Sequence, residues 1–438
     1  MTQAAAGRYS TVPAAARREP WALYLAVAGF LLLGMRQSFT VPMTFGQSLA
    51  QFLLFGGAAL WALTRLAGQR FPTGLRLLTC AMLFYVSATA ISYANSSVRG
   101  VPPAAQTLAD RYLFTDVVLL FLMFFVTTVV VTARDLDLVL KGLLAGATVS
   151  ALFGLVQVAT GVELAPMFRL PGLKYDDFQL VRDLTRGGLS RPQGSAGHPL
   201  ELGAVLTVMV PIGIGLTLSA RARGERWLLW AACTTVVAAG AAATVSRSAI
   251  IGTAVALLVM AWRWPIRRLA VIAAGALGVA VVGWLSGSKL FAALSGSFLG
   301  AATDSSVVSR TIGADYVAEH FADALVTGQG AGTYPALNQP VLDNQYFSRL
   351  METGLLGLSS YLLLLAVAIW FALRASTRLG PELADTARAI AGALCALGLI
   401  GFILDSSGFA QMWFLTFLLI ALSGVAVRLA AANGPDRT

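Results

Sequence analysis

Charged residues are scarce in this chain of 438 residues. Only 12% of the residues are Asp, Glu, Lys or Arg, whereas 57% are hydrophobic. Soluble domains carry about 25% charged residues, so a soluble globular fold is excluded. Inside a bilayer the backbone must satisfy its own hydrogen bonds, as an α-helix does. The sequence therefore predicts an all-α polytopic membrane protein.

Cysteine and histidine are also rare. All three cysteines, Cys80, Cys233 and Cys395, fall inside apolar runs, which excludes a disulfide framework and indicates small hydrophobic side chains. The two histidines, His198 and His320, are far apart in the sequence and form a poor basis for a metal site. We therefore expect neither a metal nor a cofactor.

Long hydrophobic runs recur along the whole chain. Many approach the length of about 17 to 25 residues that spans a hydrocarbon core as a helix. We predict about twelve transmembrane helices, at about residues 21–35, 48–65, 75–93, 113–133, 138–160, 200–220, 227–244, 248–264, 269–285, 347–374, 387–404 and 411–429.

Arginines gather in alternate connections between these spans. Arg221, Arg223 and Arg226, for example, follow the sixth span. With twelve spans all the basic connections fall on one side, which the positive-inside rule makes cytoplasmic together with both termini. These anchors account for most of the net charge of +10. Because they do not form a stripe with interleaved aromatics, we expect no nucleic-acid partner.

Two long extracytoplasmic loops interrupt the pattern of short connections, and loops of such length are usually functional. The second contains ADYVAEHFADALV, with apolar residues at helical spacing. The chain is predicted to divide into an N-terminal bundle of five spans at 1–160, the first loop at 161–199, spans six to nine at 200–285, the second loop with short amphipathic helices at 286–346, and the last three spans with a cytoplasmic tail at 347–438.

Arginines also occur at the predicted extracytoplasmic ends of the spans. Arg247 lies in TVSRSAII, Arg191 in RPQGSAGHPLELG and Arg310 in SSVVSRTIGADY. A charge at the bilayer centre costs about 2.5 to 3.5 kcal/mol, so Arg247 is expected at a helix end, either as an interfacial anchor or as a ligand. Several guanidinium groups near a carboxylate are suited to hold a diphosphate beside a base. The carboxylates and other polar groups come from DNQYFSRLMETGLLG, which carries Asp343, Asn344, Tyr346, Arg349 and Glu352.

Structural alternatives exist for these candidates. Asp343 can cap the helix that follows it, and Arg349 and Glu352 have the spacing of an intrahelical ion pair. His198 either touches a substrate or begins the sixth span before Pro199. Tyr346 either stacks on a sugar or marks the membrane interface.

The motifs HPLELG, SRS, FADALVTGQGAGTY and DNQYFSRLMETGLLGL, in this order over about residues 191–358, resemble the bacterial O-antigen ligase and polymerase superfamily of membrane glycosyltransferases. The resemblance implies an enzyme of cell-envelope or exopolysaccharide biosynthesis in the bacterial cytoplasmic membrane. It would transfer a glycan from a polyprenyl (undecaprenyl) diphosphate carrier to a hydroxyl of a glycan or lipid acceptor. The active site would be extracytoplasmic, and neither metal nor nucleotide sugar would be needed.

The resemblance also implies roles for individual residues. Arg191, Arg247 and Arg310 would bind the diphosphate, with Arg247 and Asp343 catalytic. Asp343 stands where the ligases usually have a histidine, and an Asp-Asn-Gln-Tyr start fits the polymerase-like branches, so a polymerase is favoured over a ligase. The remaining candidate substrate contacts are His198, Asn344, Tyr346, Arg349 and Glu352.

Other classes of membrane protein share some of these features. A transporter or flippase of lipid-linked glycans would have as many spans, but transporters place ionisable groups near the midplane. Here only Asp116 and Asp405 are candidates for such positions. A transferase of the GT-C type would need acidic residues in its first external loop, and residues 35–47 contain none.

Overall fold

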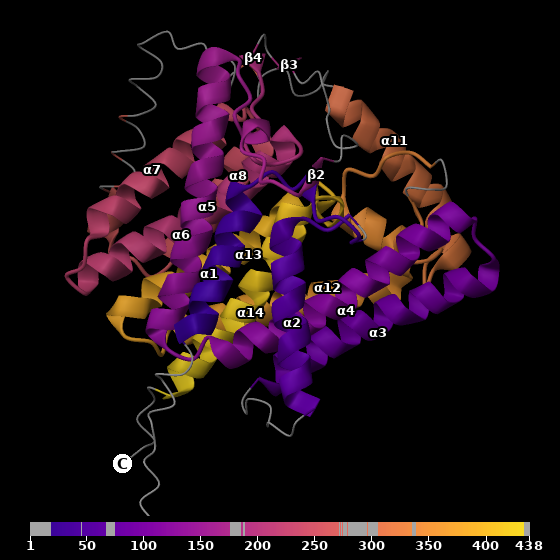
Figure 1. Cartoon of the computed structure of the whole chain (residues 1–438), viewed down its shortest axis with the longest axis horizontal. Helices are drawn as coiled ribbons and strands as arrows, with labels where there is room; N and C mark the ends of the chain where they lie inside the picture. The colour runs from indigo at the N-terminus through magenta and orange to yellow at the C-terminus, as the bar shows by residue number, and fades with distance from the viewer. Residues whose placement is uncertain are drawn as a thin grey trace, which may run out of the picture.

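The computed structural model describes residues 19–44, 46–66, 75–175, 185–186, 189–270, 272, 274, 278, 296, 305–334 and 339–432. Helices dominate this part of the chain (Figure 1). Seven of the described helices are long and apolar enough to cross a membrane: α3 (Arg76–Arg99), α4 (Pro103–Val129), α5 (Ala133–Thr160), α6 (Pro199–Ala222), α12 (Gln345–Ser376), α13 (Pro381–Ile400) and α14 (Ala410–Ala432).

Four shorter apolar helices accompany them: α1 (Glu19–Gly34), α2 (Leu49–Leu66), α7 (Trp227–Ala243) and α8 (Arg247–Ala261). Each of these eleven helices overlaps one predicted span, and the predicted span at 269–285 lies mostly outside the described residues. A mostly helical fold with several helices of membrane length is confirmed, whereas the count of twelve spans stays a prediction. The largest boundary error is at α4, which begins ten residues before the predicted start, at a proline in the first helical position.

The long connections contain regular structure. The first holds η2 (Ala165–Met167), β2 (Lys174–Tyr175), β3 (Thr185–Arg186) and β4 (Leu189–Ser190). β2 pairs antiparallel with β1 (Phe39–Thr40), and β3 pairs with β4. The second connection holds α11 (Ser305–His320) and η5 (Phe321–Ala324), and η7 (Ser406–Gly408) lies between α13 and α14. The pairing of β2 with β1 thereby joins the first connection to the strand that follows α1.

The most buried helices are α6, α13 and α14. Their most apolar stretches are 83%, 78% and 78% buried, against 39% for α3, so these three helices are central and α3 is peripheral. α6 contacts α7, α8 and α13, while α12 contacts α3, α13 and α14, and α1 runs beside α5 (Figure 1). On α5, a Cβ at Gly142 would lie 2.3 Å from the carbonyl oxygen of Ala26, so only glycine lets these two backbones approach so closely.

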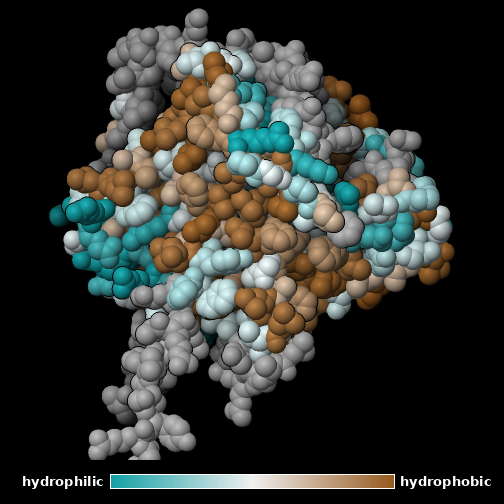
Figure 2. All heavy atoms as spheres, viewed as in Figure 1, coloured by the Kyte–Doolittle hydropathy of each residue, from teal (hydrophilic) through white to brown (hydrophobic). Residues whose placement is uncertain are grey.

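Helix ends collect at two ends of this bundle. The Arg247 end contains the ends of α1, α5 and α13 that lead out of the bundle, the beginnings of α6, α12 and α14, and the turn between α7 and α8. The Arg223 end contains the opposite ends of α5, α6, α8, α12 and α13. Figure 2 shows a broad hydrophobic surface over α1, α2 and α4 and hydrophilic residues at the connection of α6 to α7. This distribution is expected of a protein embedded in a membrane.

One long helix is broken near the Arg247 end. Gly354 in α12 adopts φ 63° and ψ −166°, which is not helical. The amides of Leu355 and Leu356 donate to the carbonyl oxygens of Leu325 and Val326, at 2.8 and 3.1 Å. The segment that follows η5 therefore replaces the hydrogen bonds that the break removes, as buried irregular backbone requires.

Candidate functional site

The turn between α7 and α8 carries the first candidate arginine. Arg247 is the first residue of α8 and is half-buried. Val245, two residues before it, has φ 48°, a left-handed conformation that is rare for a β-branched residue. Thr244 is fully buried, and a Cβ added at Gly203 on α6 would lie 2.9 Å from its Oγ1. The turn is thus strained and held closely against α6, a combination often found at functional sites.

Arg191 is fastened to the same turn. Its Nε donates to the carbonyl oxygen of Thr244 at 2.9 Å, and the side chain is buried. This hydrogen bond links the loop that precedes α6 to the turn that precedes α8. Arg191 and Arg247, which are 56 positions apart in sequence, therefore lie in one substructure.

His198 begins α6. Its Nδ1 accepts a hydrogen bond from the amide of Leu200 at 3.1 Å, Pro199 occupies the first helical position, and the ring centroid lies 5.9 Å from that of Phe409. Burial, with the nearby charge of Arg191, lowers the pKa of His198 to about 4. The imidazole is therefore neutral at pH 7 and acts as a helix cap.

Arg310 on α11 approaches from the second long connection. Its Nη2 donates to the carbonyl oxygen of Ile403 at 3.4 Å, and its buried Nε has no hydrogen-bond partner among the described residues. Burial lowers the pKa of Arg310, the charge of Asp343 opposes this shift, and the charge of Arg247 adds to it. The charges of both Arg247 and Asp343 therefore act on Arg310.

Asp343 and Arg310 line a common cavity. Its volume is about 40 Å³, and Asn344, Phe347 and Phe402 also line it. Burial raises the pKa of Asp343, Arg310 lowers it and Asp405 raises it, with a net upward shift. A carboxylate with a raised pKa is a stronger base, and here it lies beside a guanidinium group.

Asn344, and not Asp343, is the N-cap of α12. The Oδ1 of Asn344 accepts hydrogen bonds from the amides of Tyr346 and Phe347 at 2.9 and 3.2 Å. The cap therefore leaves the carboxylate of Asp343 available for the cavity. Tyr346 donates its hydroxyl to the carbonyl oxygen of Gly398 and packs against Phe402, with ring centroids 4.5 Å apart. This contact fixes α12 to α13.

Arg349 lies in a box of aromatic rings. It is 1% exposed, and its guanidinium carbon lies 4.9 to 5.6 Å from four ring centroids. Although Glu352 is three residues away, no hydrogen bond or ion pair joins the two side chains in the described part of the chain. Glu352 instead accepts from the amide of Tyr334 at 3.3 Å. The four rings belong to Tyr85, Tyr112, Tyr361 and Trp413.

The candidate residues thus separate into two groups. Arg191, Arg247, Arg310 and Asp343 come together at the Arg247 end, around the beginning of α8 and the cavity before α12. The others make structural contacts: His198 and Asn344 as helix caps, Tyr346 against α13, and Arg349 and Glu352 inside the bundle.

Residues 232–362 match the family model described as O-antigen ligase. This confirms the resemblance to the O-antigen ligase and polymerase superfamily. The matched segment contains Arg247, Arg310 and Asp343, whereas Arg191 lies before it. The O-antigen ligase match supports an enzyme of ligase or polymerase type that transfers glycans at a membrane. A search of the curated proteins finds no match to this chain.

Sequence reasoning missed one buried arginine outside the O-antigen ligase match. Arg36, which follows α1, is 2% exposed and donates to the Oε1 of Gln193 at 2.8 Å and to the carbonyl oxygen of Gly194 at 3.2 Å. Glu163 lies 4.0 Å away. Arg36 therefore fixes the loop that carries Arg191. The only sequence signal was a lone arginine directly after an apolar run, which topology explains equally well.

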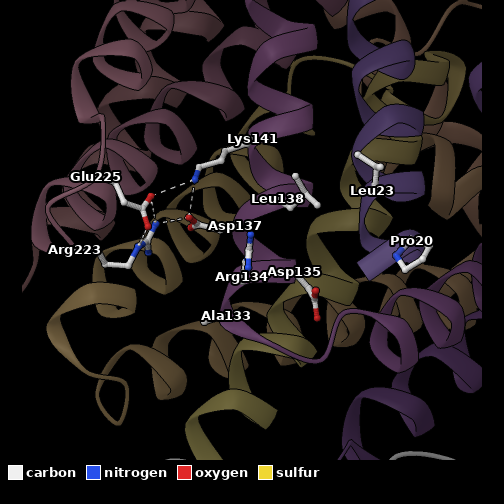
Figure 3. Close-up of a pocket in the computed structure, with 10 residues that line it drawn as sticks. All are labelled: Pro20, Leu23, Ala133, Arg134, Asp135, Asp137, Leu138, Lys141, Arg223 and Glu225. Carbon is white, nitrogen blue, oxygen red and sulfur yellow. Dashed lines mark hydrogen bonds and ion pairs between the residues drawn. The ribbon is translucent and has the colours of Figure 1, made fainter. Parts of the chain in front are cut away.

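A larger cavity lies at the Arg223 end, far from these residues. It has a volume of about 1040 Å³ and lies between the beginnings of α1 and α5 and the connection from α6 to α7 (Figure 3). Lys141 is 3.1 Å from Asp137 and 3.5 Å from Glu225, and Arg223 also contacts both carboxylates. On α5, Asp137 lines this cavity and Gln157 lies at the Arg247 end. The two residues are twenty positions, or about 30 Å, apart along the helix, so this cavity is separate from the O-antigen ligase-like site. The positive and negative side chains of this cavity compensate one another.

Proposed function

We propose that this chain transfers a glycan from a polyprenyl (undecaprenyl) diphosphate carrier to an acceptor hydroxyl at the outer face of the cytoplasmic membrane. The observation that carries the proposal is the cavity that Arg310 and Asp343 line together. The charge of Arg247 acts on Arg310, and Arg191 is hydrogen-bonded to the turn that holds Arg247. Guanidinium groups bind phosphate oxygens in a bidentate manner, so three of them suit a diphosphate.

The proposed reaction needs a base and a stabilised leaving group. Asp343 would accept the proton of the acceptor hydroxyl while its oxygen forms the new bond to the anomeric carbon. The bond from that carbon to the carrier diphosphate breaks at the same time. The arginines would stabilise the negative charge that the departing diphosphate gains. In this scheme the diphosphate leaves without protonation, and neither metal nor cofactor takes part.

The distribution of basic residues supports one orientation of the protein in the membrane. The Arg223 end has many arginines at its helix ends, which the positive-inside rule assigns to the cytoplasm together with both termini. The Arg247 end would then be extracytoplasmic, and the two long connections at 161–199 and 286–346 would form the outer loops between the three groups of spans.

The acceptor distinguishes a polymerase from a ligase. The Asp-Asn-Gln-Tyr sequence at Asp343 favours a polymerase, in which the acceptor is another carrier-linked glycan. The decisive measurement uses the purified protein in lipid nanodiscs with a polyprenyl-diphosphate oligosaccharide and excess chelator. Longer chains on the carrier identify a polymerase, and glycan transferred only to an added second acceptor identifies a ligase. Asp343→Asn, which keeps the size of the side chain, should form neither product.

A transporter or flippase of the same lipid-linked glycans is the second candidate. The break in α12 at Gly354 favours it, because discontinuous helices are typical of transporter binding sites. An assay in sealed vesicles distinguishes the two functions. Movement of the labelled glycan lipid across the membrane, with no change in glycan length in any assay, would identify the transporter and reject the transferase.

A further inference from the structure

An apolar groove at the Arg223 end lies between α8, α12 and α13. Its volume is about 370 Å³. Val259, Trp262, Trp370 and Leu373 supply apolar wall, and Trp262 and Trp370 are 74% and 46% exposed. Tryptophans with this exposure at helix ends are typical of the boundary between hydrocarbon and headgroups. The groove is therefore placed where a lipid can reach it from the side.

Three arginines line the same groove: Arg263 just after α8, Arg374 near the end of α12 and Arg388 on α13. Within the described residues, Arg263 and Arg374 form no ion pair with a carboxylate. The guanidinium group of Arg374 instead lies over the ring of Trp370, 5.1 Å from the ring centroid. Two positive charges at the groove are therefore not compensated.

The third arginine, Arg388, pairs with a carboxylate that it shares with other donors. Arg388 donates from Nη2 to Oδ1 of Asp385 at 2.6 Å, and Arg268 donates to Oδ2 of the same residue at 3.3 Å. The indole nitrogen of Trp264 also donates to Asp385, at 2.7 Å. The Nε of Arg388 is buried and has no hydrogen-bond partner among the described residues. Asp385 thus cannot neutralise the groove.

The larger cavity in Figure 3 provides a contrast at the same end of the bundle. There, Lys141 and Arg223 are each paired with Asp137 and Glu225, so the cavity has no excess of positive charge. Of these two sites, the groove between α8, α12 and α13 is the one that combines apolar walls with uncompensated arginines. This combination fits a ligand that has an anionic head and a hydrocarbon tail.

We infer that this groove binds an anionic phospholipid of the surrounding membrane. The phosphodiester would lie between Arg263, Arg374 and Arg388, which match phosphate oxygens through planar N–H donors. The acyl chains would run along Trp262 and Trp370 into the bilayer. A soluble phosphate compound shares the headgroup chemistry but would leave these apolar walls uncovered. The site is separate from the proposed glycan transfer and does not depend on it.

The test compares two double variants of the full-length protein. Arg263→Gln with Arg374→Gln removes two charges from the groove, whereas Arg267→Gln with Arg378→Gln removes two exposed charges from the same end outside it. Native mass spectrometry measures binding of phosphatidylglycerol and of phosphatidylcholine with identical acyl chains. Each arginine near an anionic headgroup contributes about fivefold to binding, so the groove variant should bind phosphatidylglycerol roughly 30-fold more weakly. The control variant should bind it within about twofold of the parent protein.

Three results would overturn the inference. Equal losses in the two double variants would indicate general attraction to a basic surface. Equal binding of phosphatidylcholine would remove the requirement for an anionic head, and displacement of the lipid by an equal concentration of glycerol 3-phosphate would remove the requirement for acyl chains. Thermal unfolding of both variants in the same detergent, without added lipid, verifies that each is folded before binding is measured.

Discussion

Arg191 and Thr244 are joined by a hydrogen bond of 2.9 Å from the Nε of the arginine to the carbonyl oxygen of the threonine. Thr244 begins the strained turn that precedes Arg247. Through this hydrogen bond, Arg191 fixes the position of the turn and therefore that of Arg247. Arg36 holds the loop that carries Arg191 in the same way. Arg191 and the turn of Arg247 are therefore preorganised, which is the property that stabilisation of a charged leaving group requires.

Replacement of Arg247 by alanine tests the role of this turn. Loss of one preorganised donor to a developing charge reduces a rate by about 100-fold or more. We expect Arg247→Ala to lose glycan transfer to at least this extent and to insert and unfold as the parent protein does. The assay is product formation in nanodiscs, with Arg378→Ala, which removes an exposed arginine at the other end, as the matched control. An active Arg247→Ala protein would make Arg247 an interfacial anchor.

The pH dependence of transfer tests Asp343 as the base. Activity should fall as the pH decreases through the pKa of Asp343, which lies above its ordinary value because of burial, partly opposed by Arg310 and increased by Asp405. Asp405→Asn removes the electrostatic contribution to this raised pKa and leaves that of burial, so the acid limb of kcat/KM should move to lower pH. The asparagine retains a side-chain oxygen for the hydrogen bond from the amide of Ser407, now 3.0 Å long.

His198 provides the control for that profile. With a pKa lowered to about 4 it remains neutral between about pH 5 and 8, so it cannot produce an acid limb in that range. His198→Asn, which keeps a helix-capping side chain, should leave the position of the limb unchanged. A limb that moves with His198→Asn and stays fixed with Asp405→Asn would exclude Asp343 as the titrating base.

The stability of Asp343→Asn gives a test that needs no substrate. A carboxyl group whose folded pKa is raised binds its proton more tightly in the folded protein. Stability is therefore lost as the pH rises from the unfolded pKa through the folded one. At pH 7 the charged form costs stability, so Asp343→Asn should raise the Tm at pH 7. Asp315→Asn on the exposed face of α11 should leave the Tm unchanged. A lower Tm for Asp343→Asn would show that the carboxylate stabilises the fold.

Replacement of Arg349 by lysine separates a structural role from substrate contact. Lysine keeps the charge but loses the planar group that lies among four rings, and a desolvated cation–π contact contributes about 2 kcal/mol or more. Arg374→Lys is the control, because its guanidinium group lies 5.1 Å from the centroid of the partly exposed Trp370, where about 0.5 to 1 kcal/mol is expected. Unfolding in mixed detergent micelles should show the larger loss for Arg349→Lys. Inactivity with undiminished stability would instead support contact with the substrate.

These residues show what the sequence can and cannot predict. Apolar runs gave eleven of the described helices, because hydropathy alone decides which segments lie in a bilayer. The start of α4 was missed because its first turns are polar and only Pro103 marks them. The spacing of Arg349 and Glu352 suggested an ion pair, but the rings around Arg349 come from helices far apart in the sequence, which no local pattern reveals. Asp343 and Asn344 are both good caps, and only the backbone geometry distinguishes them.

Gly354 forms the break in α12. Gly354 has φ 63°, and a Cβ there would lie 2.4 Å from the carbonyl carbon and oxygen of Val326, so Gly354→Ala adds a backbone clash to conformational strain. Gly224→Ala is the control, because Gly224 has φ 70° with no atom within 4 Å of the added Cβ, and strain alone should cost about 1 to 2 kcal/mol. Thermal unfolding in detergent should show a clearly larger fall in Tm for Gly354→Ala. Equal shifts in the two variants would mean that the segment after η5 moves away easily, and then its hydrogen bonds to Leu355 and Leu356 would not be what maintains the break.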